Sequence, residues 1–264
     1  LVTHYYASVL DGIEDYASRN GYSVISANSH ESHLREEKAI ESFISMHVEG
    51  IIACLAQDTV DYQHYLQLHE MGIPVVFFAR TCLPEKFSQV VANGDEAAQE
   101  ATSHLIARGA RRIAFIGGPN HLDMVKRRKH GYLEALRDHR LPIDRDLVLC
   151  GKIDFDEARQ ATLQLLQSEK RPDAILAFND IITYAAFDAI KACGLRIPDD
   201  VAIIGFTDGD SAAFVTPKLS AIMDQAHEQG FKSCELLLRH IGGDLHIYRE
   251  IIPMILKIRE SSEK

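Results

Sequence analysis

Residues 101–119 read ATSHLIARGARRIAFIGGP, and this stretch decides the fold class. Its first half carries small and apolar residues at three-to-four spacing as far as Leu105, which predicts a helix that ends at Gly109. Its second half, Arg112–Gly117, is apolar almost throughout, as a strand covered on both faces should be. A helix that leads directly into a buried strand is typical of α/β folds with parallel strands.

The same alternation extends over the rest of the chain. Short apolar runs alternate with segments that keep a helical apolar stripe, such as residues 6–17 and 182–189. The sequence begins at such a helix, and in a parallel α/β sheet a strand precedes each helix. We therefore expect residues upstream of Leu1. The runs expected to be strands are Tyr22–Ala27, Gly50–Leu55, Pro74–Ala79, Gln89–Ala92, Arg112–Gly117, Leu147–Cys150, Ala174–Phe178, Val201–Phe206, Leu219–Met223 and Met254–Ile258.

The composition narrows the class of protein. With 264 residues, of which 46% are hydrophobic and 25% charged, the chain is long enough for one large or two medium globular domains. The formal charge of −10 argues against nucleic-acid binding by this chain itself, because phosphate contacts need clustered Lys and Arg. The sequence contains neither an apolar run of about 20 residues nor a signal-peptide pattern, so we expect no membrane contact.

The five cysteines are odd in number, far apart and mostly set among apolar neighbours, with no CxxC spacing. This usage indicates reduced thiols in a cytoplasmic protein and argues against a cysteine metal site. The cysteines are Cys54, Cys82, Cys150, Cys193 and Cys234.

Polar residues follow several of the expected strands, for example Asn179, the pair Thr207 and Asp208, and Asp224. Ligands of open α/β sheets bind outside the carboxyl ends of the strands, so these side chains are candidate ligand contacts. Amides, carboxylates and aromatic rings suit a polyhydroxylated ligand. Asn and Asp after a strand are equally common as helix caps, and both interpretations stay open at each position.

These segments, in this order, resemble the effector-binding domain of the lactose-repressor (LacI/GalR) family of transcription regulators. The resemblance extends over the whole chain and depends on the combination of segments, since no single one is specific. The segments are residues 48–52 (VEGII), 72–76 (GIPVV), 104–106 (HLI) leading to 112–119 (RIAFIGGP), 131–132 (GY), 178–180 (FND), 197–201 (IPDDV) and 205–206 (GF).

The resemblance implies a periplasmic-binding-protein-like type I fold, in which two Rossmann-like lobes with parallel sheets are joined by three crossovers. We place the crossovers near Gly118, Asp224 and Pro253. The N-terminal lobe would comprise residues 1–118 and 224–253, and the C-terminal lobe residues 119–223 and 254–264.

The resemblance also implies a cleft for a small polar effector, expected to be a sugar or a sugar derivative, with a nucleoside as the open alternative. Arg128, three residues before Gly131, occupies the position of the family's ligand-clamping arginine. Where the family has an acidic pair after Gly-Phe, this chain has Thr207 and Asp208, and Asp224 stands where glutamine is common. We therefore hypothesise that the acidic function has moved from Thr207 to Asp224. The full set of predicted ligand contacts is His4, Tyr5, Tyr6, Asn93, Glu96, Arg128, Asn179, Thr207, Asp208 and Asp224.

An enzymatic function is not indicated. The sequence lacks GxSxG, Walker, GxGxxG and HExxH motifs, and we predict no catalytic residue, cofactor or metal site. His30 and His33 lie three apart in a polar stretch, but no third metal ligand is indicated. The alternative function is that of a periplasmic sugar-binding protein of an ABC importer, which would share the fold. The free cysteines and the ending Arg259-Glu260-Ser261 favour the regulator.

The family's mechanism implies a homodimer that reaches operator DNA through an N-terminal helix-turn-helix not in this chain. Effector bound in the cleft would favour a closed arrangement of the lobes and change the spacing of the DNA-binding heads. Residues 5–20 in the first lobe are the candidate moving interface.

Overall fold

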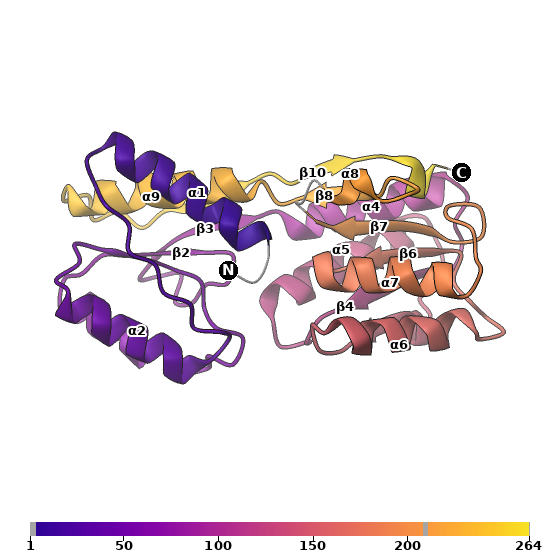
Figure 1. Ribbon diagram of the computed structural model, residues 1–264, viewed down its shortest axis with the longest axis horizontal. Helices are drawn as coiled ribbons and strands as arrows, with labels where there is room; N and C mark the ends of the chain where they lie inside the picture. The colour runs from indigo at the N-terminus through magenta and orange to yellow at the C-terminus, as the bar shows by residue number, and fades with distance from the viewer. Residues whose placement is uncertain (1–3, 208–210, 264) are drawn as a thin grey trace. The chain divides into compact units, whose positions relative to one another are not determined.

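The computed structural model describes residues 4–207 and 211–263, and the chain divides into two compact units (Figure 1). Unit 1 comprises Leu1–Ala92 and Gln225–Ile252, and unit 2 comprises Asn93–Asp224 and Pro253–Lys264. The chain thus passes between the units three times. The passages after Asp224 and before Pro253 lie where the sequence placed them, but the first follows Ala92 and not Gly118. Our first boundary was wrong because the strand that ends at Gly117 pairs within the sheet of unit 2.

Unit 1 is an α/β unit whose described residues form a four-stranded sheet in the order β1-β2-β3-β9. Every pairing in this sheet is parallel, with Ile52 opposite Val76 and Val90 opposite Glu250. Its elements are α1 (His4–Arg19), α2 (His33–Ser45), β1 (Ile51–Ala53), α3 (Gln63–Glu70), β2 (Val75–Phe78), β3 (Ser88–Ala92), α9 (Ala226–Ile241) and β9 (Arg249–Ile252).

The two faces of the β2 strand show how this sheet is covered. Successive side chains of a strand point to opposite faces, so Val75 and Phe77 lie on one side and Val76 and Phe78 on the other. Val75 and Phe77 belong to a core cluster with residues of α2 and α3. Val76 and Phe78 pack into clusters with residues of α9, and Phe78 also with α1. The sheet of unit 1 therefore has helices on both faces.

Helices α1 and α9 approach each other to backbone contact. A Cβ atom added at Gly12 would lie 2.0 Å from the carbonyl oxygen of His227, and one added at Gly230 would lie 1.9 Å from that of Val9. Only glycine permits this distance between helix axes, since any side chain would push the two helices apart. These contacts pair residues 9–12, in the middle of α1, with the first two turns of α9.

Unit 2 is the larger sheet domain, and its described residues form six strands in the order β10-β8-β7-β6-β4-β5. All pairings are parallel except that of β10 with β8, which is antiparallel. Its elements are α4 (Gly94–Ala107), β4 (Ile113–Gly117), α5 (Asp123–Asp138), the 3-10 turn η1 (Arg145–Leu147), β5 (Val148–Cys150), α6 (Phe155–Leu166), β6 (Ala174–Ala177), α7 (Asp180–Ala192), β7 (Ala202–Phe206), α8 (Ser211–Phe214), β8 (Ser220–Met223), β10 (Ile255–Lys257) and the 3-10 turn η2 (Glu260–Ser262).

The sequence signature at residues 131–132 has a packing role in unit 2. A Cβ atom on Gly131 would lie 1.9 Å from the carbonyl oxygen of Asp95, so glycine lets α5 contact the backbone of α4. The next residue, Tyr132, is 1% exposed and donates its hydroxyl to the carbonyl of Ile113 at 2.8 Å. Together these two residues fix α5 against both α4 and the strand β4, and so position the residues that precede them on α5.

The α/β fold class is confirmed, with three differences in detail. Residues 22–27 form no strand; Ile25 is exposed, and the run pairs with none of the described strands, whose hydrogen bonds a strand requires. Strand β9 was not expected, because its half-exposed sequence REII carries no apolar run. The run at 254–258 does form a strand, β10, but it is antiparallel to its neighbour where parallel pairing was expected.

All five cysteines are free, and Cys82 and Cys234 are buried. Burial raises the pKa of the Cys82 thiol to about 12 and that of Cys234 to about 11. These two thiols are therefore protonated and unreactive at neutral pH. Within the described part of the chain, none of the helices is long and apolar enough to cross a membrane.

Candidate functional site

A group of polar and aromatic side chains lies where the parallel strands of unit 2 end. Asn179 follows β6, Thr207 follows β7 and Asp224 follows β8, while Arg128 comes from the second turn of α5. Because these strands are parallel, their carboxyl ends meet at one edge of the sheet, which is where α/β proteins bind ligands.

Arg128 is the centre of this group. Its side chain is only 4% exposed, and its Nη2 donates to both carboxylate oxygens of Asp224, at 3.0 and 3.2 Å. Its Nη1 donates to the carbonyl oxygen of Phe178 at 2.5 Å. The guanidinium carbon lies 3.9 Å from the centre of the Phe206 ring and 5.0 Å from that of Phe178. The arginine is thus held by a carboxylate, a carbonyl and two ring faces at once.

The sequence assigned Arg128 to clamp the ligand directly, and this stays a prediction. Each of its terminal nitrogens donates to a protein partner. Within residues 4–207 and 211–263, its Nε is buried without a hydrogen-bond partner. The Asp224 side chain, at 15% exposed, is the more accessible member of the pair. Arg128 therefore holds the Asp224 carboxylate at this edge of the sheet through both carboxylate oxygens.

Two further predicted contacts lie at this edge. Asn179 is the N-cap of α7, and its side-chain oxygen accepts from the backbone N–H of Ile182 at 3.0 Å, so capping is one function of this residue. Thr207 is 2% exposed, and among the described residues its hydroxyl oxygen is buried without a hydrogen-bond partner. An unpaired buried hydroxyl is uncommon and is therefore a candidate ligand contact. The prediction for Asp208 falls on residues 208–210, outside the described residues.

Asn93 and Glu96 lie in unit 2, whereas the sequence analysis assigned them to the first lobe. The amide of Asn93 donates to the Glu96 carboxylate at 2.7 Å, and its oxygen accepts from the backbone N–H of Met254 at 2.7 Å. Asn93 thereby links the segment that enters unit 2 at residue 93 to the one that enters at residue 253. The assignment was wrong for the same reason as the domain boundary, because the chain leaves unit 1 after Ala92.

A second polar group lies in unit 1, near the carboxyl ends of β1 and β2. The Tyr6 hydroxyl accepts from Arg80 Nη2 at 2.9 Å and lies 3.8 Å from the Cys54 sulfur, and burial raises the pKa of this phenol. The neighbouring Tyr5 donates to the Gln229 side chain at 2.8 Å, and the two tyrosine rings contact edge to face. Polar hydroxyls with aromatic faces are the groups expected of a sugar contact.

The remaining predicted residue of this segment, His4, is the first residue of α1. It is exposed, and its Nδ1 lies 3.3 Å from the hydroxyl of Ser8. His4 is therefore not part of the buried network around Tyr6.

Arg80 was not among the predicted contacts, yet it organises this group. Its guanidinium makes a two-pronged contact with the Glu31 carboxylate, both N–O distances being 2.8 Å, while it also binds Tyr6. The available signal was its position as the first charged residue after the apolar run Pro74–Ala79. Position alone does not show that the side chain turns back toward α1, so the contact requires the structure.

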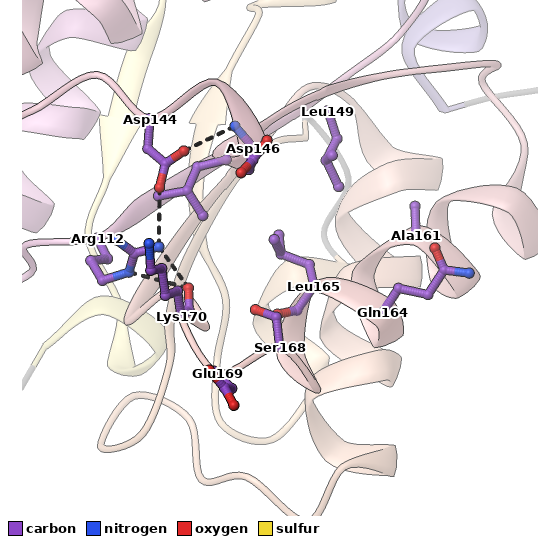
Figure 2. Close-up of a pocket in the computed structure, with 11 residues that line it drawn as sticks. Arg112, Asp144, Asp146, Leu149, Ala161, Gln164, Leu165, Ser168, Glu169 and Lys170 are labelled. Carbon is purple, nitrogen blue, oxygen red and sulfur yellow. Dashed lines mark hydrogen bonds and ion pairs between the residues drawn. The ribbon is translucent and has the colours of Figure 1, made fainter.

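A pocket of about 530 Å³ lies elsewhere in unit 2 (Figure 2). Arg112, Asp144 and Lys170 contribute to its lining, and they precede β4, β5 and β6, at the opposite edge of the sheet from Asp224. The guanidinium of Arg112 is bound to the Asp144 carboxylate and the Lys170 carbonyl, as the dashed lines in Figure 2 show. Because α/β proteins bind ligands at the carboxyl ends of their strands, this pocket is not the candidate site.

Comparison with known proteins supports the fold and the class. Residues 102–262 match the model of the periplasmic binding protein-like domain. The chain is 28% identical to the transcriptional repressor PurR of Vibrio atlanticus, over 96% of this chain and 76% of the relative. It is also 28% identical to the ribose operon repressor of Halalkalibacterium halodurans, over 98% of this chain and 76% of the relative.

Among solved structures, the complex of the transcriptional regulator CelR with cellobiose matches with a TM-score of 0.89 and 28% identity. The match covers 97% of this chain and 79% of that one. None of the relatives named here is an importer component, which removes support from the alternative function. The family model spans more than half of the chain, and the named relatives are transcription regulators. The chain therefore belongs to the periplasmic binding protein-like family and is the effector-binding domain of a LacI/GalR-type transcription regulator.

Proposed function

We propose that this domain binds a sugar or sugar derivative through the Asp224 carboxylate, and that Arg128 is the positioning residue for that carboxylate. The observation that carries the proposal is the buried contact of one arginine nitrogen with both oxygens of Asp224 at the carboxyl edge of the unit 2 sheet. An ionised carboxylate is a strong acceptor for ligand hydroxyls. Because Arg128 already fixes the carboxylate, its side chain loses little conformational entropy when the ligand binds.

The other polar groups support a hydroxyl-rich ligand. Thr207 brings a buried hydroxyl and Asn179 an amide at the same edge. We extend the proposal to Tyr5 and Tyr6 as aromatic contacts from unit 1, and to Asp208, which stays a prediction. Two of the named relatives are consistent with a sugar effector, since one solved neighbour is a complex with cellobiose and one relative is a ribose operon repressor.

For Asn93 and Glu96 we propose a structural role in place of a ligand contact. They bind each other, and Asn93 also binds the backbone at Met254, so we propose that they fix the entry of two chain segments into unit 2. His4 remains a predicted contact without further support.

The effector would act by binding differently to two states of the regulator. A ligand shifts a conformational equilibrium only by its difference in affinity for the two states, and DNA affinity changes by the same coupling free energy. We propose that the protein functions in the cytoplasm as a homodimer, that operator DNA is bound by a further domain, and that the effector is released chemically unchanged.

A thermal-shift screen against sugars, sugar acids, nucleosides and purines tests this function. A ligand at about 100 times its dissociation constant stabilises a fold by about 2.7 kcal/mol. For a protein of this size that corresponds to a rise in melting temperature of roughly 5–10 °C. The expected result is a hit among hydroxyl-rich compounds that is recovered unaltered after prolonged incubation. Consumption of the compound, or no shift with any compound, would contradict the proposal.

A further inference from the structure

Three side chains of metal-binding type come together in unit 1, apart from the groups discussed above. They are His33 in the first turn of α2, Glu36 one turn further along, and His64 near the start of α3. One ligand atom of each lies within 4.8 Å of the other two. Spacing of three on a helix puts His33 and Glu36 on one face. Helix α3 brings His64 to that face because α2 and α3 share a core cluster against the sheet.

The carboxylate of Glu36 is buried and held in place. Its side chain is 7% exposed, and that of His64 is 6% exposed. One oxygen of Glu36 accepts from the backbone N–H of Ala56 at 2.5 Å, and the other accepts from Thr59 Oγ1 at 3.0 Å. His64 Nε2 lies 3.0 Å from that second oxygen. Such supporting hydrogen bonds orient the ligands of metal sites and are as important as the ligands themselves.

The two imidazole rings have unused nitrogens. Among the residues that the structure describes, Nδ1 of His33 and Nδ1 of His64 are buried and have no hydrogen-bond partner. The ring centres are 5.1 Å apart. Buried polar atoms nearly always have a partner, so two unpaired nitrogens beside one buried carboxylate require an explanation. A cation bound by the carboxylate would take one nitrogen of each ring, and Nε2 of His64 already faces Glu36.

We propose that His33, Glu36 and His64 bind a divalent transition-metal ion, with zinc the best match to the donor set. Two imidazoles and one carboxylate suit zinc, whereas calcium and magnesium prefer oxygen ligands. Tetrahedral zinc with bonds of about 2.0–2.1 Å needs ligand atoms roughly 3.3 Å apart, and the present ligand atoms lie within 4.8 Å of one another. Three protein ligands leave a fourth position for water.

This site is distinct from the proposed effector contacts, and its consequence is local. Glu36 and its partners join the start of α2, the loop at residues 56–59 and the start of α3. A metal ion bound there would cross-link these segments and raise the melting temperature of the protein, because it binds the folded state only.

The test is calorimetric titration of the metal-free protein with zinc chloride, for the wild type and the variants His33→Ala, His64→Gln and His69→Ala. His69 is exposed on α3 and serves as the control for adventitious surface binding. We expect one equivalent bound by the wild type and by His69→Ala, and at least tenfold weaker binding by His33→Ala and His64→Gln. Circular dichroism checks folding, and His33→Ala, whose side chain is 28% exposed, keeps the test valid if His64→Gln does not fold.

Cobalt substitution gives a second readout, since four-coordinate cobalt absorbs visible light far more strongly than six-coordinate cobalt. An intense cobalt spectrum that disappears in His33→Ala supports the site. Two results would overturn the proposal. One is a folded wild-type protein that binds no zinc, which would leave the cluster as a buried ion pair between helices. The other is zinc binding that neither histidine substitution weakens.

Discussion

Replacement of Arg128 by alanine is the perturbation whose cost follows most directly from the structure. The side chain is 4% exposed and its partner Asp224 is 15% exposed, so solvent screens the pair poorly. Removal of one member of a buried ion pair leaves an uncompensated charge and costs about 3–5 kcal/mol. For a protein of this size each kcal/mol lowers the melting temperature by roughly 2–4 °C. We therefore expect Arg128→Ala to lower it by roughly 6–20 °C.

The neighbouring arginine provides a matched control. Arg127 lies on the same helix, its side chain is 35% exposed, and its ion pairs with Asp123 and Asp95 measure 3.1 and 3.6 Å. Exposed pairs contribute at most about 1 kcal/mol, so Arg127→Ala should lower the melting temperature by only a few degrees.

Scanning calorimetry of both alanine variants, and of a double-mutant cycle with Arg128→Met and Asp224→Asn, separates the pair from the packing. The cycle should give a coupling free energy of about 1.5–3 kcal/mol, the range for hydrogen bonds to charged groups. If Arg128→Ala lowers the melting temperature no more than Arg127→Ala, the pair with Asp224 is not desolvated and does not stabilise the fold more than an exposed pair.

Three further outcomes are expected. Gly131→Ala should force α4 and α5 apart, because its Cβ would lie 1.9 Å from a carbonyl oxygen of α4. It should lower the free energy of unfolding in urea by more than about 2 kcal/mol. The control Gly151→Ala, whose Cβ would have no atom within 4 Å, should be nearly neutral. Asn179→Ala removes the cap of α7 and should cost about 0.5–2 kcal/mol in the same assay; no loss would show that the cap bond is dispensable. Cys82 and Cys234, with thiol pKa values raised by burial to about 12 and 11, should resist a thiol reagent at pH 8 until denaturant is added, and rapid native labelling of either would refute their burial.

The strand pattern of unit 2 could be predicted because buried parallel strands require continuous apolar runs. Residues 113–117 and 202–206 are buried throughout, and such runs stand out in a sequence. The signature at Gly131 and Tyr132 likewise has a direct physical cause in the close contact between α4 and α5. Constraints of this kind restrict the residue type at particular positions and can therefore be recognised in the sequence.

Features that depend on distant partners could not be predicted. Strand β9 has only one buried residue and forms by pairing with β3, 160 residues away in the chain. The residues 22–27 look like a strand but lack a described neighbour to pair with.

The candidate sites show the same limit. The sequence marked Arg128 and Asp224 separately, but the ion pair between them joins residues 96 positions apart. His64 stands 31 residues from His33, so a search for nearby histidines could not find the third ligand.

The proposed function depends on binding of the effector by the Asp224 carboxylate, which Arg128 holds in place. The most direct test is calorimetric titration of the compound identified in the screen into the wild type, Asp224→Asn and the control Glu96→Gln, whose carboxylate is exposed in the same unit. Loss of hydrogen bonds to a charged group costs about 1.5–3 kcal/mol, so we expect binding roughly 10- to 150-fold weaker for Asp224→Asn and unchanged for Glu96→Gln. Equal affinity of a folded Asp224→Asn protein and the wild type would contradict it.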